Sequence, residues 1–109
     1  MTSERDRAIE KILAAARALL AGERDALETA QAIAFVRLAV DPDQHDPDLL
    51  AFGSIESQTD HHLVRDSLKG WAPEVREQKE REYAEDEAFF RKGAMESAQA
   101  LVERYGRAT

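Results

Sequence analysis

The sequence contains no cysteine and few glycines, and each shortage excludes a class of protein. Without cysteine there is no disulfide framework, no thiolate catalysis and no cysteine-ligated zinc. The five glycines are not clustered, so no glycine-rich loop is available to hold a nucleotide phosphate. No apolar run resembles a signal-peptide core or approaches the roughly 20 residues of a membrane span. These absences predict a cytoplasmic protein that does not enter the membrane.

Charge is what the sequence has in quantity. The 109 residues carry a formal net charge of −7, with 34% charged and 43% hydrophobic residues, which predicts one folded domain covering residues 1–109. An acidic surface repels the phosphates of nucleic acids and of anionic lipids, so neither is an expected partner. A basic protein surface is the natural complement, because opposite potentials speed the encounter. Solubility alone is the competing explanation of the charge.

Apolar residues recur at three- and four-residue spacing along most of the chain, which is typical of helices. Ser3 is an N-cap candidate for a helix over residues 4–21, and Gly22 suits its C-terminal cap. A second helix is predicted with Glu23 and Asp25 in its first turn and apolar residues from Leu27 to Val40, and the short turn at Gly22 favours an antiparallel hairpin. Asp46 with Pro47 starts a third, short helix that ends near residue 57.

The second half of the chain contains one long helical pattern, from Pro73 to Gly106. A weaker pattern over 63–69 allows one more short helix before it. Residues 76–87 are almost all charged, so this part of the long helix should be solvated or used by a partner. No segment alternates apolar and polar residues as a strand would. The predicted fold is all-α: a compact bundle of four or five helices with a long C-terminal helix.

The loop over residues 41–48 contains four aspartates and two prolines, and it should be exposed to solvent. Asp41, Asp43 and His45 fall at alternate positions, as calcium ligands do. An EF-hand loop, however, needs glycine at its sixth position and glutamate at its twelfth, where this chain has Asp46 and Phe52. We therefore interpret the loop as a partner-binding surface and not as a calcium site.

The segment Asp60-His61-His62 offers metal-ligand types, but its spacing argues against a metal site. Adjacent histidines on a helix point about 100° apart, and no His-Glu-x-x-His pattern is present. Hydrolysis by a serine nucleophile lacks its Gly-x-Ser-x-Gly motif as well. The sequence therefore predicts no metal, no cofactor and no catalytic residue.

Residues 57–71 are also interpreted as a structural connection between the short third helix and the long helix. Ser57 and Thr59 are expected to be structural, with Thr59 or Asp60 capping a following helix. Trp71, the only tryptophan, is either a core residue between the short and the long helix or an interface anchor, and burial is the favoured interpretation.

The central residues resemble a family of small uncharacterised bacterial proteins, a domain of unknown function. Its signature runs Asp-x-Asp-Phe, then Ser-Glu-Thr-Asp-His-Leu-Pro and, further on, a tryptophan. The chain matches that signature at Asp46, Asp48, Phe52, Ile55, Ser57, Thr59, Asp60, His61 and Trp71. It departs from it at Gln58, His62 and Leu63, where the family has Glu, Leu and Pro. The resemblance implies an all-helical bacterial fold and no particular chemistry. In size and charge the chain is also similar to bacterial immunity proteins, which neutralise a toxin by covering its active site.

The leading functional prediction is a protein-binding inhibitor, an immunity or antitoxin-like protein that docks an acidic surface onto a basic toxin domain. The expected contacts are the polar residues of the two central segments: Asp41, Asp43, His45, Asp46, Asp48, Asp60, His61 and His62. One alternative is a structural or adapter protein that forms a homodimer through Phe89, Phe90, Leu101 and Val102 of the long helix. A metal-assisted enzyme using Asp60, His61 and His62 is the second alternative.

Overall fold

The computed structural model describes residues 2–62 and 71–106, and these residues fold into four helices with no strand. The all-α prediction is thereby confirmed, as is the long C-terminal helix. The helices are α1 (Glu4–Leu20), α2 (Ala26–Val40), α3 (Pro47–Thr59) and α4 (Pro73–Gly106). The weak helix predicted over 63–69 lies outside the described residues. Within the described part of the chain, no helix is long and apolar enough to cross a membrane.

Side-chain caps explain where the first three helices begin. The hydroxyl of Ser3 accepts a hydrogen bond from the Asp6 amide at 3.0 Å, as predicted. Asp25 and Glu28 form a reciprocal capping box at the start of α2. Asp46 caps α3, and Pro47 occupies the first helical turn. Gly22 follows α1 with a φ of 78°, a left-handed conformation that glycine adopts without strain.

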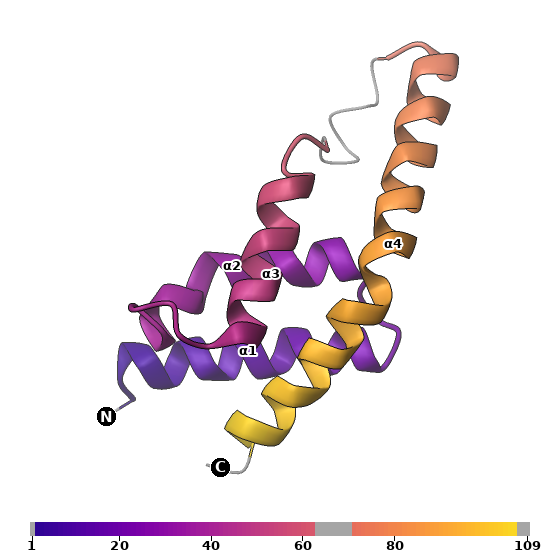
Figure 1. Ribbon diagram of the computed structural model, residues 1–109. Helices are drawn as coiled ribbons and strands as arrows, with labels where there is room; N and C mark the ends of the chain where they lie inside the picture. Colours follow the sequence, from indigo (N-terminus) through magenta and orange to yellow (C-terminus); the bar gives the residue numbers. More distant parts are fainter. Residues whose placement is uncertain (1, 63–70, 107–109) are drawn as a thin grey trace.

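The four helices form two pairs, α1 with α2 and α3 with α4, which cross each other around one core. α1 and α2 form the predicted hairpin, α3 packs on α2, and α4 packs on α1 and α3. In Figure 1, α3 and α4 run in opposite directions across the α1–α2 pair. The largest fully buried hydrophobic side chains come from all four helices: Ile12, Leu27, Ile33, Leu49, Phe52 and Leu101. A single core therefore holds the bundle together.

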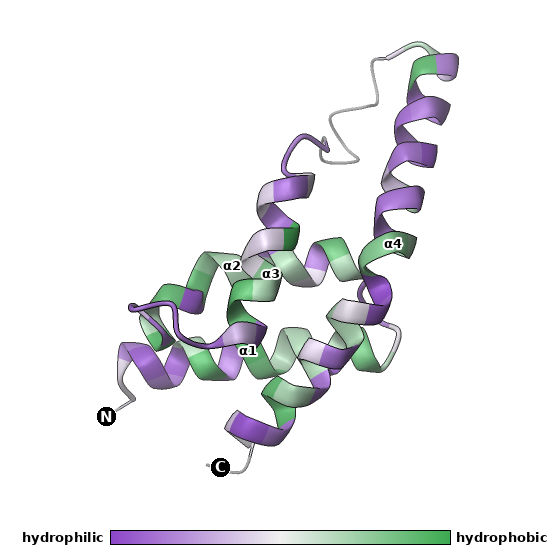
Figure 2. Cartoon of the chain, in the orientation of Figure 1, coloured by the Kyte–Doolittle hydropathy of each residue, from purple (hydrophilic) through white to green (hydrophobic). Residues whose placement is uncertain are grey.

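Helix α4 has two halves with different surroundings. Its buried residues begin at Glu87 and continue with Ala94, Ser97, Ala98 and Leu101, so its first half is not covered by the other helices. Figure 2 shows that this uncovered half is mostly hydrophilic. The molecule measures 49 × 27 × 24 Å, because the uncovered half of α4 extends along the long dimension.

Three sequence predictions about the long helix and the segment before it are wrong. Trp71 is 42% exposed and does not plug the core. Asp60 is the C-cap of α3 and not an N-cap, and the hydroxyl of Thr59, the last residue of α3, donates to the Ile55 carbonyl at 2.6 Å. Glu87, expected among the solvated residues, is only 5% exposed. The local pattern could not show the burial of Glu87, because its partner, the Ala26 amide, lies 61 residues away in the sequence.

Candidate functional site

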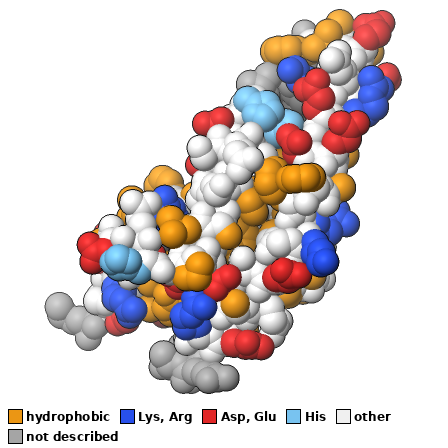
Figure 3. Space-filling view, viewed as in Figure 1, with side chains coloured by type: hydrophobic (Ala, Val, Ile, Leu, Met, Phe, Trp, Pro, Cys, Tyr) orange, Lys and Arg blue, Asp and Glu red, His pale blue; other side chains and the backbone are white. Residues whose placement is uncertain are grey.

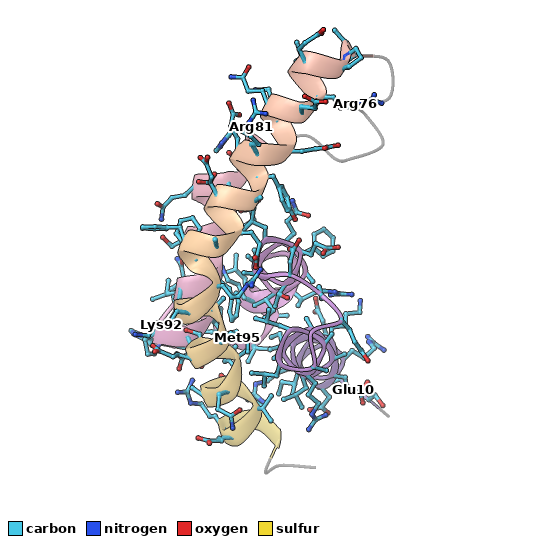
Figure 4. All side chains as sticks on the ribbon, turned by 90° about the vertical axis from the view of Figure 1, so that its right-hand side faces the viewer. Glu10, Arg76, Arg81, Lys92 and Met95 are labelled. Carbon is cyan, nitrogen blue, oxygen red and sulfur yellow. The ribbon has the colours of Figure 1, made fainter. Side chains whose placement is uncertain are left out.

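The uncovered half of α4 is a densely charged surface. We call residues 73–86 the acidic arm: they contain six acidic and three basic residues, a net −3 of the chain's −7. Glu74, Glu77, Glu80 and Glu85 are exposed. Figure 4 shows Arg76 and Arg81 on the arm, and Lys92 and Met95 on the half of α4 that lies against the other helices.

The arm is helical although no residue in it is buried. Its residues are mostly strong helix formers, and the packed half of α4 provides turns onto which the arm can propagate. Local pairs add a little: Lys79 lies 3.6 Å from Glu82, and the amide of Gln78 donates to Glu82 at 3.2 Å. Among the described residues, the glutamates at 74, 77, 80 and 85 are exposed, whereas Tyr83 and Asp86 at the base of the arm are partly buried.

Polar contacts attach the base of the arm to α3. Nε2 of His62 lies 2.6 Å from Oδ2 of Asp86, so the imidazole donates a hydrogen bond to that carboxylate. Nε2 of His61 is 3.9 Å from the same oxygen. The His62 side chain is 5% exposed, while those of His61 and Asp86 are 59% and 38% exposed. In Figure 3, histidine and acidic side chains lie together where the end of α3 faces α4.

A second set of contacts attaches the same part of α4 to the start of α2. The phenol of Tyr83 donates to both carboxylate oxygens of Asp25, at 2.8 and 3.1 Å. The backbone amide of Ala26 donates to Glu87 at 3.0 Å, and Arg91 forms an ion pair with the same carboxylate. A negative charge at a helix N-terminus is favourable, so Glu87 is a buried acid with a structural use. Its charge also raises the pKa of Arg91.

The aspartate loop is tied to the far end of α4. Asp46 accepts hydrogen bonds from Arg104 at 2.8 Å and from Tyr105 at 2.7 Å, in addition to its capping bonds, and Asp48 accepts from Arg104 at 2.9 Å. Asp41 accepts from the backbone amides of residues 45 and 46. Three of the loop acids therefore hold the loop and α3 in place.

These contacts shift the pKa values of the loop and helix groups. Partial burial alone would raise the pKa of Asp46, but the hydrogen bonds from Tyr105, Arg104 and two backbone amides outweigh it, so the pKa lies below 3.8. Burial and the bond to Asp46 raise the pKa of Tyr105 to about 12. Bonds to Asp48 and Asp46 raise the pKa of Arg104. The charged carboxylate is thus the form that the fold prefers.

The predicted partner-binding residues fall into two spatial groups. Asp43 and His45 are exposed in the loop, whereas Asp41, Asp46 and Asp48 are half-buried and engaged within the fold. Asp60, His61 and His62 lie at the other end of α3, beside the acidic arm. The partner role of both groups stays a prediction. Of the predicted structural residues, Thr59 is buried, while Ser57 and Trp71 are exposed.

Sequence reasoning missed Asp86 as the residue that joins the two histidines. It assumed that His61 and His62 continue a helix, but both follow its end, and their ring centroids are 4.3 Å apart. Within the described residues, His61, His62 and Asp86 are the one group that could hold a metal ion, with ligand atoms all within 4.8 Å of one another. In the sequence, the acidic residues after Tyr83 are the one feature that could have indicated a carboxylate near the histidines.

Large apolar side chains are exposed on three of the described helices, including Leu50 on α3. Phe35 on α2 is 90% exposed, Leu38 is 52% exposed, and Phe89 on α4 is 78% exposed. Leu101, expected in a dimer interface, is fully buried instead, and Phe90 and Val102 pack against the core. Of the four residues expected in that interface, Phe89 is therefore the one that is mostly exposed.

Comparison with known proteins adds no further identification. No family model, no curated protein and no solved structure matches the chain. The resemblance to the family with the Ser-Glu-Thr-Asp-His-Leu-Pro signature stays a prediction.

Proposed function

We propose that the protein is a binding module for a basic protein, and that the acidic arm is its contact surface. The main observation behind this proposal is that residues 73–86 form a charged helical segment in which no residue is classed as buried. Helices in small domains draw most of their stability from packing an apolar face. The arm contacts the other helices at its base, through Tyr83 and Asp86, whereas the turns before that base present mostly charged, exposed side chains. A partner is therefore the better explanation of the composition of those turns.

The chemistry of the arm fits a partner rich in arginine and lysine. Its exposed glutamates can accept charge-assisted hydrogen bonds, and guanidinium groups pair with carboxylates through two parallel bonds. Asp60 adds one more exposed acid at the end of α3. Clustered negative charge also speeds the encounter with a positive surface at low ionic strength.

An inhibitor of a bacterial toxin is the specific form of this function that we favour. Toxins that act on nucleic acids need a basic active-site surface to hold phosphates. An acidic helix can occupy such a surface in place of the phosphates. The similarity of the chain to bacterial immunity proteins in size and charge supports this form. We place the contact on the arm and not on the 41–48 loop, because Asp41, Asp46 and Asp48 are engaged within the fold.

The test is co-expression with the product of the adjacent gene, because an inhibitor is normally encoded beside its target. The parent should rescue growth and bind the purified product. A variant with Glu77→Gln, Glu80→Gln and Glu85→Gln should associate at least about tenfold more slowly. The control variant carries Glu10→Gln, Glu23→Gln and Glu96→Gln, which remove the same charge from exposed sites outside the arm. Equal association rates for the two variants would refute the arm as the contact surface.

Self-association is the second candidate function, and the exposure of Phe35 and Phe89 favours it. Exposed phenylalanines on a small domain often lie in an interface. Light scattering between about 10 and 500 μM separates the two candidates. A dimer that Phe35→Ala or Phe89→Ala dissociates supports self-association, whereas a monomer over the whole range removes its basis.

A further inference from the structure

The cluster at the base of the acidic arm has the composition of a metal site. It contains two imidazoles and one carboxylate, a ligand set that suits zinc and other divalent transition metals. The ligands come from two elements: His61 and His62 follow α3, and Asp86 lies on α4. A metal bound by all three would therefore crosslink the end of α3 to α4.

The distances are close to those that a metal requires. Zinc binds histidine nitrogen and carboxylate oxygen at about 2.0 to 2.2 Å, which places tetrahedral ligands about 3.3 to 3.5 Å apart. The two histidine Nε2 atoms lie 2.6 and 3.9 Å from Oδ2 of Asp86, and all candidate ligand atoms lie within 4.8 Å of one another. Each separation can reach the required value through a movement of about 1.5 Å or less, and the exposed ring of His61 is free to make most of it.

The surroundings of His62 hold its ring in place. Its side chain is only 5% exposed, and its ring meets that of Tyr83 edge-on at a centroid distance of 5.3 Å. Tyr83 is itself fixed by its hydrogen bonds to Asp25. Such supporting contacts orient a metal-binding imidazole and raise affinity. The side chains of His61 and Asp86 are 59% and 38% exposed, so an ion can reach them, and the described residues supply three of its ligands.

We propose that His61, His62 and Asp86 bind one divalent transition-metal ion of the zinc type, and that the ion fastens the acidic arm to α3. The proposal does not depend on the function of the arm. It reverses the sequence interpretation, in which the two histidines diverged on a helix and no metal was expected. The interpretation changes for two reasons. Helix α3 ends before Asp60, so the histidines are not held on a helix, and Asp86 of α4 lies beside them.

The experiment is calorimetric titration of the tag-free, chelator-treated protein with Zn²⁺. One equivalent should bind, and an excess of about 100-fold over Kd should raise the midpoint of thermal unfolding by about 10 °C. His61→Ala, His62→Ala and Asp86→Asn should each weaken binding by at least about 100-fold, because even supporting contacts are worth about 10- to 100-fold. The matched controls are His45→Ala, the remaining histidine, and Glu85→Gln, the neighbouring exposed acid.

The His61→Ala variant protects the test against a failure to fold. His61 is 59% exposed, so its replacement should leave the metal-free unfolding midpoint unchanged while it removes the response to Zn²⁺. A purely structural His62–Asp86 hydrogen bond would give no such response in the parent. The proposal is overturned if the parent binds no stoichiometric Zn²⁺ at about 100 μM, if His61→Ala binds as the parent does, or if His45→Ala abolishes binding.

Discussion

The junction between Asp46 and the end of α4 allows the most detailed prediction. Asp46→Ala removes an N-cap, which costs about 1 kcal/mol. It also removes the hydrogen bond from Tyr105 to a charged acceptor, worth about 1.5 to 3 kcal/mol. The Arg104 side chain is 43% exposed, so its ion pair adds only about 0 to 1 kcal/mol. The expected loss of unfolding free energy is about 3 kcal/mol, a large share of the stability of a small domain.

Urea denaturation followed by helical circular dichroism measures this loss. At a slope of about 1.5 kcal/mol per molar urea, the midpoint should fall by about 2 M. Asp46→Asn retains a good cap and should lose less. Asp43→Ala, at an exposed acid of the same loop, should change the unfolding free energy by less than about 0.5 kcal/mol. If Asp46→Ala unfolds like the parent, Asp46 does not stabilise the fold. The 41–48 loop would then again be the favoured partner-binding surface.

The same junction predicts the sign of the pH dependence. The pKa of Asp46 is lower in the folded chain, so its charged form stabilises the fold at neutral pH. That contribution is lost as the pH falls below about 4 and through the lowered folded pKa. The pKa of Tyr105 is raised to about 12, so its contribution is complete below about pH 10 and is lost as the pH rises towards 12. Asp46→Asn should flatten the acid limb of the stability curve; an acid limb equal to the parent's would contradict this assignment.

Three further changes test the account of the fold. Glu87→Gln weakens the acceptor for the Ala26 amide and for Arg91, and it should cost about 1 to 3 kcal/mol in the same urea assay; no loss would deny the buried acid its structural use. Trp71→Ala should cost less than about 1.5 kcal/mol because the ring is 42% exposed, and a loss of about 3 to 5 kcal/mol would show that it is buried in solution. Phe35→Lys should leave the urea midpoint of a monomer unchanged, since the ring is 90% exposed; a clear loss of stability would reveal a covering contact.

Local chemistry was sufficient to predict the helices. Ser3, Gly22 and the Asp46-Pro47 pair marked helix ends through groups within three or four residues of each terminus, and the structure shows each in its expected position. Periodic apolar residues identified the covered faces for the same reason. Helix α4 continues to Gly106, the last described residue, so the helix end predicted there borders residues outside the described ones.

Contacts between distant segments could not be predicted in this way. Asp46 was recognised as a cap, but its partners Arg104 and Tyr105 lie 58 and 59 residues away. Nothing in the charged run of the long helix separates Glu87, which is buried, from its solvated neighbours. Asp86 meets His62 only because α3 and α4 pack together. The site therefore depends on tertiary packing, whereas the predicted elements depend on neighbours along the chain.

The association rate between this chain and the purified product of its adjacent gene is the most direct test of the acidic arm as a contact surface. Stopped-flow measurements at about 20 and 300 mM salt should give a rate that falls at least about tenfold with salt for the parent. The fall should be much smaller for the variant carrying Glu77→Gln, Glu80→Gln and Glu85→Gln. A rate that is independent of salt and equal in parent and variant, or no binding at all, would contradict the proposed function.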